Sequence, residues 1–334
     1  MKNLPLWLET IAVFIPVVLS LIAIWKSITV DKRLKRYEAD LQDDLASKKA
    51  LRDYRYDALK RIYRDGEPML FQLIESIEST EFKIRAFARD SKRGELLGFS
   101  SDVYHQDSAV YRIFAPCAFY QSLRRTFTIL DLSLDPYVAA LYSMLKVAYF
   151  VLTDHYRIAA LEPAIEYRGN YFRADKIADI RQGVLLNQMD NIAEKFLARE
   201  QDRYRVIAFD EFQRMSMFKT FEKSKDDFAL PWELFYEFTP QTRPVLWREL
   251  IIQATLYAAM RRVNAARLDF FRRGEETRGI DIDPASFVQC LDGAEREQYY
   301  WLSDSGAAGE DMNVAFRVAQ AYLKAKFPGE VGRK

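Results

Sequence analysis

Candidates for catalytic chemistry are few in this chain of 334 residues. Its histidines are His105 and His155, and only the second has an adjacent carboxylate, that of Asp154. Neighbouring residues on a helix point in different directions, so this pair is poorly placed to act as a carboxylate-supported base. The sequence contains no phosphate-binding glycine loop and no nucleophile-elbow motif. It therefore predicts no catalytic residue.

Arginines gather toward the end of the helix predicted over 244–273. Guanidinium groups bind phosphates and carboxylates through paired hydrogen bonds, so this end is the candidate anion or ligand contact. The residues concerned are Arg261, Arg262, Arg267, Arg272 and Arg273. The alternative is a solvated helix face, with Asp269, Glu275 and Glu276 as salt-bridge partners.

Metals, cofactors and nucleic acid are not indicated. Cys117 and Cys290 lie far apart in the sequence, which argues against a disulfide framework and fits a reducing compartment. Zinc sites cluster cysteine and histidine at short spacing, and these residues do not. Lys and Arg (49) nearly balance Asp and Glu (48), whereas nucleic-acid-binding domains carry a marked basic excess.

One apolar segment, 4–25, reads LPLWLETIAVFIPVVLSLIAIW. Its length matches the roughly 20 residues that a helix needs to cross a bilayer, and Trp7 and Trp25 stand near its ends. Basic residues follow it at Lys26, Lys32, Arg33, Lys35 and Arg36, whereas only Lys2 precedes it. The positive-inside rule then predicts a single-pass plasma (inner) membrane protein with its N-terminus outside and its C-terminal domain in the cytoplasm.

Two residues inside this predicted transmembrane helix are candidates for a pore. Glu9 either marks the membrane interface or faces a water-filled space between several copies of the helix, because an ionised carboxylate is costly in hydrocarbon. Pro16 stands at mid-span, removes one backbone hydrogen bond and can kink the helix.

Residues 31–66 predict a long helical stalk. The segment has no proline or interior glycine and carries an apolar stripe at helical spacing, formed by Leu34, Tyr37, Leu41, Leu45, Leu51, Tyr54, Ala58 and Ile62. Asp44 and Lys48 interrupt a strict heptad. The stripe fits two arrangements equally, a coiled coil between copies and an amphipathic helix packed on the body of its own chain.

Residues 67–328 predict an all-α cytoplasmic domain with at most a minor β element. Helical periodicity or helix-start signals place helices at 69–89, 108–130, 136–161, 175–200, 244–273, 284–292 and 308–327. A short strand is expected within 201–208, and short helices mixed with loops over 209–244. The apolar run 138–152 contains Lys146 and is too short to cross a bilayer, so it predicts a buried core helix.

Two stretches, RIYRDGEPMLF and ILDLSLDP, carry a resemblance. Over roughly 32–167 the chain resembles uncharacterised bacterial proteins, common in actinobacteria, that place one membrane helix and a charged helical stalk before a helical domain. That family supplies no catalytic residues. The architecture is also similar to that of membrane effectors in bacterial anti-phage systems, an analogy of layout and not of motif.

The functional expectation is a non-enzymatic, membrane-anchored homo-oligomer whose span disrupts the membrane or forms a pore. The first alternative is a passive scaffold that recruits a protein partner to the bilayer. The second is a membrane-tethered enzyme or ligand sensor that uses the arginines of 261–273.

Overall fold

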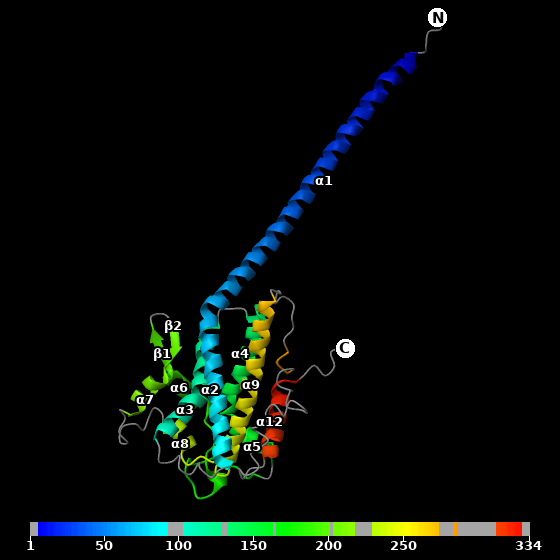
Figure 1. Ribbon diagram of the computed structural model, residues 1–334. Coiled ribbons are helices and arrows are strands. Elements are labelled where there is room, and N and C mark those ends of the chain that lie inside the picture. The colour runs from blue at the N-terminus through cyan, green and yellow to red at the C-terminus, as the bar shows by residue number, and fades with distance from the viewer. Residues whose placement is uncertain are drawn as a thin grey trace. The chain divides into compact units, whose positions relative to one another are not determined.

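The computed structural model describes residues 6–92, 103–127, 132–162, 165–200, 203–217, 229–273, 283–285 and 312–328. In the first helix it describes the side chains at 19–20 and from 23 onward. The chain divides into two compact units, Met1–Ala58 and Leu59–Lys334. The expected all-α class is confirmed, because helices dominate the described residues and the sheet found among them has two strands (Figure 1).

The first unit consists of helix α1, which runs unbroken from Leu6 to Arg61, its last turn belonging to the second unit. Among the described residues, no helix has both the length and the hydropathy needed to cross a membrane. Most of the predicted span, 4–25, lies outside the residues whose side chains are described, so the span stays a prediction. Over the predicted stalk, the apolar side chains of Leu34, Leu41 and Leu45 are exposed.

The break expected at 65–68 is wrong. The chain stays helical through a π-helical turn, η1 (Ile62–Gly66), and continues as α2 (Glu67–Lys92). Pro68 has no N–H to donate, and it lies two residues after the π-helical turn, which already departs from the regular hydrogen-bond pattern of an α-helix. Gly66 is required by close packing, since a Cβ there would lie 2.8 Å from Cζ of Phe127.

The second unit is built around α9 (Pro244–Arg272), as expected for the longest helix of the body. It packs against α2, α4 (Pro136–Val151), α5 (His155–Ala160) and α12 (Met312–Lys326). Figure 1 shows α2, α4, α9 and α12 running side by side. Residues 245–260 are all buried, so α9 is covered on every side over that stretch.

Helix α3 (Val103–Phe127) packs on α2 and contains Pro116 in its interior. It starts earlier than the expected residue 108; the centre of the loop expected over 90–107 lies outside the described residues. Because proline has no N–H, the carbonyl of Arg112 loses its helical partner. The hydroxyl of Thr80, on α2, donates a hydrogen bond to that carbonyl. The two helices are thus tied together where α3 is interrupted.

Helix α4 begins as predicted but ends earlier than expected. Asp135 caps it, with Oδ1 accepting from the backbone N–H of Tyr137 (3.0 Å) and Val138 (3.1 Å), and Pro136 is its first residue. The helix expected to reach 161 stops at Val151, followed by a turn and α5. The reason is tertiary: the N–H of Val184, from a distant loop, donates to the carbonyl of Leu152 at 2.9 Å.

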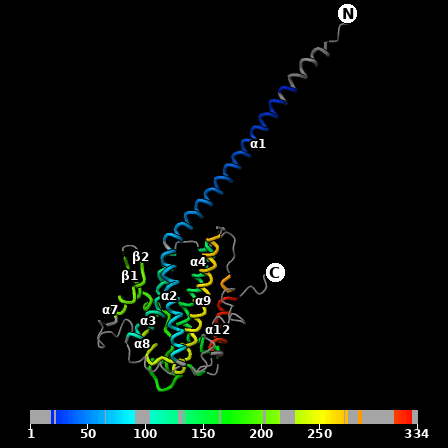
Figure 2. The backbone as a smooth tube through the Cα atoms, in the orientation of Figure 1, coloured from blue at the N-terminus to red at the C-terminus, as the bar shows by residue number. Residues whose placement is uncertain are grey.

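The amphipathic helix expected over 175–200 is also wrong in extent. The segment forms η4 (Ile177–Asp179), α6 (Leu186–Lys195) and strand β1 (Leu197–Glu200). Strand β1 pairs antiparallel with β2 (Arg203–Val206), which confirms the strand predicted within 201–208. In Figure 2 this hairpin lies on the opposite side of the second unit from α12.

The remaining elements are short. The turn η3 (Leu132–Leu134) precedes α4, and α7 (Phe209–Met217) and α8 (Ala229–Phe235) agree with the mixture expected over 209–244. Within 308–327 the helix α12 is confirmed. Most of the helix expected at 284–292 lies outside the described residues.

Candidate functional site

A polar pocket lies between α3 and α6. Residues three and four apart on a helix share a face, so α3 presents Gln121, Arg124 and Arg125 together, and α6 presents Asp190 and Glu194. The pocket has a volume of about 340 Å³. Two arginines face two carboxylates, so the lining is close to neutral.

Its floor is a hydrogen-bond network. The buried amide of Gln121 donates from Nε2 to Oδ1 of Asp190 at 2.7 Å and to the hydroxyl of Tyr149 at 2.8 Å. Tyr149, on α4, in turn donates to Asp190. Burial, and then this carboxylate, raise the pKa of the Tyr149 hydroxyl, which holds it as a neutral donor. The network joins α3, α4 and α6 in one place.

The rim of the pocket is an ion pair. Arg125 binds Glu194 through its two terminal nitrogens, Nη1 and Nη2, and its guanidinium lies 4.6 Å from the ring centre of Tyr204 on β2. The five lining residues include no serine, cysteine or histidine. The lining of the pocket therefore consists of polar side chains, four of which pair with one another, and it offers no nucleophile.

The sequence predicts that five arginines form one anion contact. In the structure their side chains point in several directions. Arg261 reaches back to α2, where Nη1 lies 3.2 Å from Oε2 of buried Glu81. Arg267 is buried, with its guanidinium 5.5 Å from the ring centre of Tyr63. These two side chains contact different groups on different elements.

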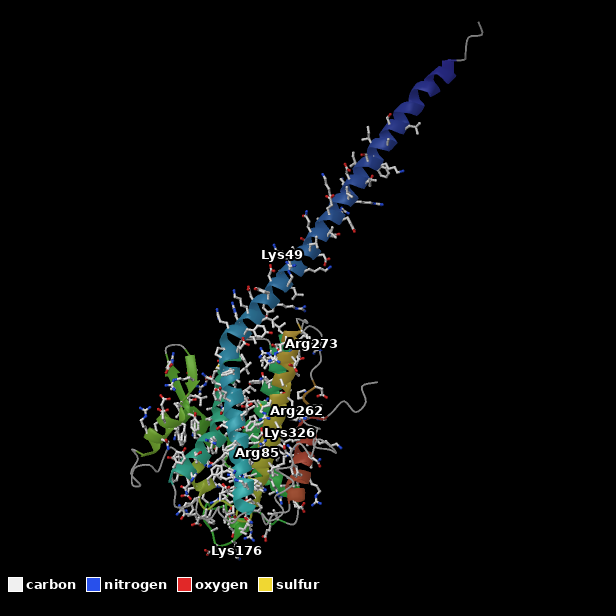
Figure 3. All side chains as sticks on the ribbon, in the orientation of Figure 1. Lys49, Arg85, Lys176, Arg262, Arg273 and Lys326 are labelled. Atoms are coloured by element: carbon white, nitrogen blue, oxygen red, sulfur yellow. The ribbon has the colours of Figure 1, made fainter. Side chains whose placement is uncertain are left out.

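The other arginines of this set are more exposed. Arg272 lies 3.4 Å from the carboxylate of Asp269, and Arg273 donates to the Asp269 carbonyl. Arg262 is half-buried, and Figure 3 shows it midway along α9, well away from Arg273 at the helix end. The structure does not gather the five into one pocket. Glu275 and Glu276 lie outside the described residues.

The predicted pore residues cannot be placed. Glu9 and Pro16 lie within α1, and both side chains are outside the described set. Among the described residues, no cluster of three or more histidine, cysteine, aspartate or glutamate side chains could hold a metal ion.

Asp154 and His155 have separate partners. The Asp154 carboxylate accepts from the hydroxyl of Tyr322 at 2.7 Å and lies 2.9 Å from Nζ of Lys326. His155 is buried at the start of α5, with Nδ1 2.9 Å from the hydroxyl of Tyr167. Burial lowers the pKa of His155 to about 4, so the ring is neutral near pH 7. Both side chains therefore have structural partners here.

A line of buried polar side chains on α9 escaped the sequence analysis. Glu249, Gln253 and Tyr257 are four residues apart and almost completely buried. Neither Glu249 oxygen, nor Oε1 of Gln253, nor the Tyr257 hydroxyl has a hydrogen-bond partner among the described residues. A buried group left unpaired costs about 1–3 kcal/mol. The only sequence signal was polar residues at helical spacing within an apolar helix.

Burial raises the pKa of Glu249 well above its usual range, and the charge of Asp154 adds to the shift. Burial therefore favours the neutral, protonated form of this carboxyl. Gln253 donates from Nε2 to the carbonyl of Ala148 in the last turn of α4, at 3.2 Å. The line thus lies where α9 faces α4.

Gln182 and Arg243 fix the start of this helix. Oε1 of Gln182 accepts from the N–H of Val245 (2.6 Å) and Leu246 (3.4 Å), which caps α9 from a loop distant in sequence. The buried guanidinium of Arg243 donates to the carbonyls of Arg181 (2.9 Å) and Phe172 (3.2 Å). Burial lowers its pKa to about 10, and it remains charged near pH 7.

Comparison with known proteins adds no relative: no protein-family model, curated protein or solved structure matches this chain.

Proposed function

We propose that this chain is a non-enzymatic membrane protein, anchored by residues 4–25, that self-associates through its stalk and acts on the membrane through the assembled spans. The observation that carries the proposal is the continuity of α1 from Leu6 to Arg61. One unbroken helix joins the apolar segment to the charged stalk. Copies held together along the stalk would therefore bring their apolar segments close to one another.

The surface of the stalk supports self-association. Leu34, Tyr37, Leu41 and Leu51 are exposed and fall on positions that alternate by three and four residues. This is the seam of a helix that packs against another helix. Asp44 and Lys48 occupy the intervening seam positions and pair with each other at 2.7 Å within one helix.

In such an assembly, Glu9 is the residue proposed to line a water-filled path, and Pro16 bends the span beside it. The body is proposed to lie in the cytoplasm, with the basic residues 26–36 at the inner face of the plasma membrane. A role as a membrane-disrupting effector in bacterial anti-phage defence, and the resemblance to actinobacterial membrane proteins, belong to this proposal and rest on sequence alone.

The test is expression of the full chain in bacteria while the membrane potential is recorded with a voltage-sensitive dye. We expect the wild type to depolarise the cells and Glu9→Leu to abolish the effect, because the path loses its polar lining. Glu38→Leu is the matched control, since it makes the same change in the exposed stalk of the same helix. It should depolarise as the wild type does.

Replacing residues 1–26 by an unrelated single span separates pore from scaffold. Loss of depolarisation, with assembly retained by cross-linking, supports the pore. If the exchanged chain keeps full biological function, residues 4–25 only anchor the protein and it is a scaffold. If the wild-type protein assembles but leaves the membrane potential unchanged, the pore hypothesis is excluded.

A further inference from the structure

Three side chains of the buried line on α9 carry hydrogen-bonding atoms that have no partner in the part of the chain that the structure describes. Glu249 contributes both carboxyl oxygens, Gln253 its Oε1, and Tyr257 its hydroxyl, all among the described residues. Each side chain is at least nine-tenths buried. Native proteins pair nearly all buried polar atoms, with water where no protein group is available.

The spacing of the three residues suits a bridging molecule of the size of water. Residues four apart on a helix have Cβ atoms roughly 5–6 Å apart. Two consecutive hydrogen bonds of about 2.8 Å that meet at one oxygen at a roughly tetrahedral angle span ~4.5 Å, which the ends of side chains on one helix face can match. One water between Glu249 and Gln253, and another between Gln253 and Tyr257, would follow the helix axis.

We propose that Glu249, Gln253 and Tyr257 form an internal binding site for ordered water, in a file along α9 where it faces α4. Nε2 of Gln182, near the start of the same helix, is a further buried donor that has no hydrogen-bond partner among the described residues. The site lies entirely in the second unit and does not depend on the proposed membrane function.

The chemistry favours water over a cation. A hard cation prefers ionised carboxylates. Here burial raises the pKa of Glu249 and disfavours the ionised carboxylate that such a cation would need. With a protonated carboxyl the open groups include both acceptors and O–H donors, and water can pair with either kind without adding charge. The Tyr257 hydroxyl, whose pKa burial also raises, can both donate to water and accept from it.

The experiment counts long-lived internal waters in the full chain, purified in a non-ionic detergent, by ¹⁷O magnetic relaxation dispersion. Tyr257→Phe removes one hydroxyl and keeps the ring. We expect this variant to lose at least one long-lived water and to melt at a lower temperature than the wild type. Glu249→Met removes both carboxyl oxygens at similar volume and should also lose at least one.

Tyr149→Phe is the matched control. It removes a buried tyrosine hydroxyl whose partners are the protein groups Gln121 and Asp190, so stability should fall while the water count is unchanged. If Tyr257→Phe and Glu249→Met both keep the same number of long-lived waters as the wild type, the proposal is overturned, whatever happens to stability. A higher melting temperature in Tyr257→Phe overturns the proposal as well. Such an increase is expected when the hydroxyl that is removed was buried without a water partner.

Discussion

At the scale of the residue, Glu249 combines complete burial with a carboxyl group. An ionised carboxylate in such surroundings would be removed from bulk water, which disfavours its charge, so burial favours the protonated form. Asp154, at the turn between α4 and α5, adds negative charge and strengthens the effect. Ionisation of Glu249 is therefore coupled to unfolding.

The stability of the second unit should consequently fall with rising pH through this group. The folded-state pKa of Glu249 is raised above the unfolded value of about 4.5, so its contribution is fully present below that pH and is lost as the pH rises toward the folded-state pKa. The slope in this window is about 1.4 kcal/mol per pH unit. Glu249→Gln removes the titrating group. We therefore expect the stability of the variant, relative to that of the wild type, to increase between pH 5 and 7.

Urea unfolding of both proteins at a series of pH values measures this difference directly. Comparing the two chains cancels the contributions of all other titrating groups. Parallel curves for the wild type and Glu249→Gln would show that the carboxyl titrates alike in the folded and unfolded states, contrary to the prediction.

At the scale of the element, the α2–α3 pair depends on a backbone defect. Pro116 leaves the carbonyl of Arg112 without its helical N–H, and Thr80 of α2 supplies the missing donor. The hydroxyl also contacts the Ser76 carbonyl, at 2.9 Å. The proline that the sequence marks as a bend is thus also a point of attachment between helices.

Thr80→Val, which keeps the shape and removes the hydroxyl, should destabilise the protein by about 1–3 kcal/mol, because the Arg112 carbonyl is left unpaired. In a Pro116→Ala background, the new N–H of residue 116 pairs with that carbonyl. The same Thr80→Val change should then cost less. A double-mutant cycle by urea denaturation measures the coupling free energy between the two substitutions. A coupling of zero would show that the contribution of Thr80 to stability does not depend on Pro116.

At the scale of the whole molecule, self-association of the stalk is the step on which the proposed function depends. Asp44 and Lys48 lie at consecutive seam positions and balance each other's charge. In paired stalks that run in the same direction, two aspartates and two lysines would meet in neighbouring layers. Their equality in number keeps this polar part of the seam neutral.

Asp44→Lys alone or Lys48→Asp alone should therefore weaken association several-fold, because four like charges then meet at the seam. The double exchange, Asp44→Lys with Lys48→Asp, should restore it. Analytical ultracentrifugation of the full chain in detergent, at low salt, measures the dissociation constant. Single variants that associate like the wild type would place the interface elsewhere on the molecule, and would leave the anchoring role of residues 4–25 to be judged on its own.

The sequence by itself determined the features that depend on local chemistry. Helical periodicity predicted α2, α9 and α12, and the Asp135-Pro136 pair predicted the start of α4, because a cap acts on backbone groups two and three residues away. The all-α class follows from such local preferences. The apolar segment and its basic flank are likewise properties of the sequence alone, and they carry the proposed membrane anchoring.

Only the tertiary structure decided where these elements stop and which polar groups meet. The helix expected to reach 161 ends at Val151 because Val184, far along the chain, binds the Leu152 carbonyl. The pocket between α3 and α6 and the buried line on α9 depend on which helix faces which. Sequence periodicity shows that a face is buried, but it does not identify the partner or show whether a polar atom within that face is paired.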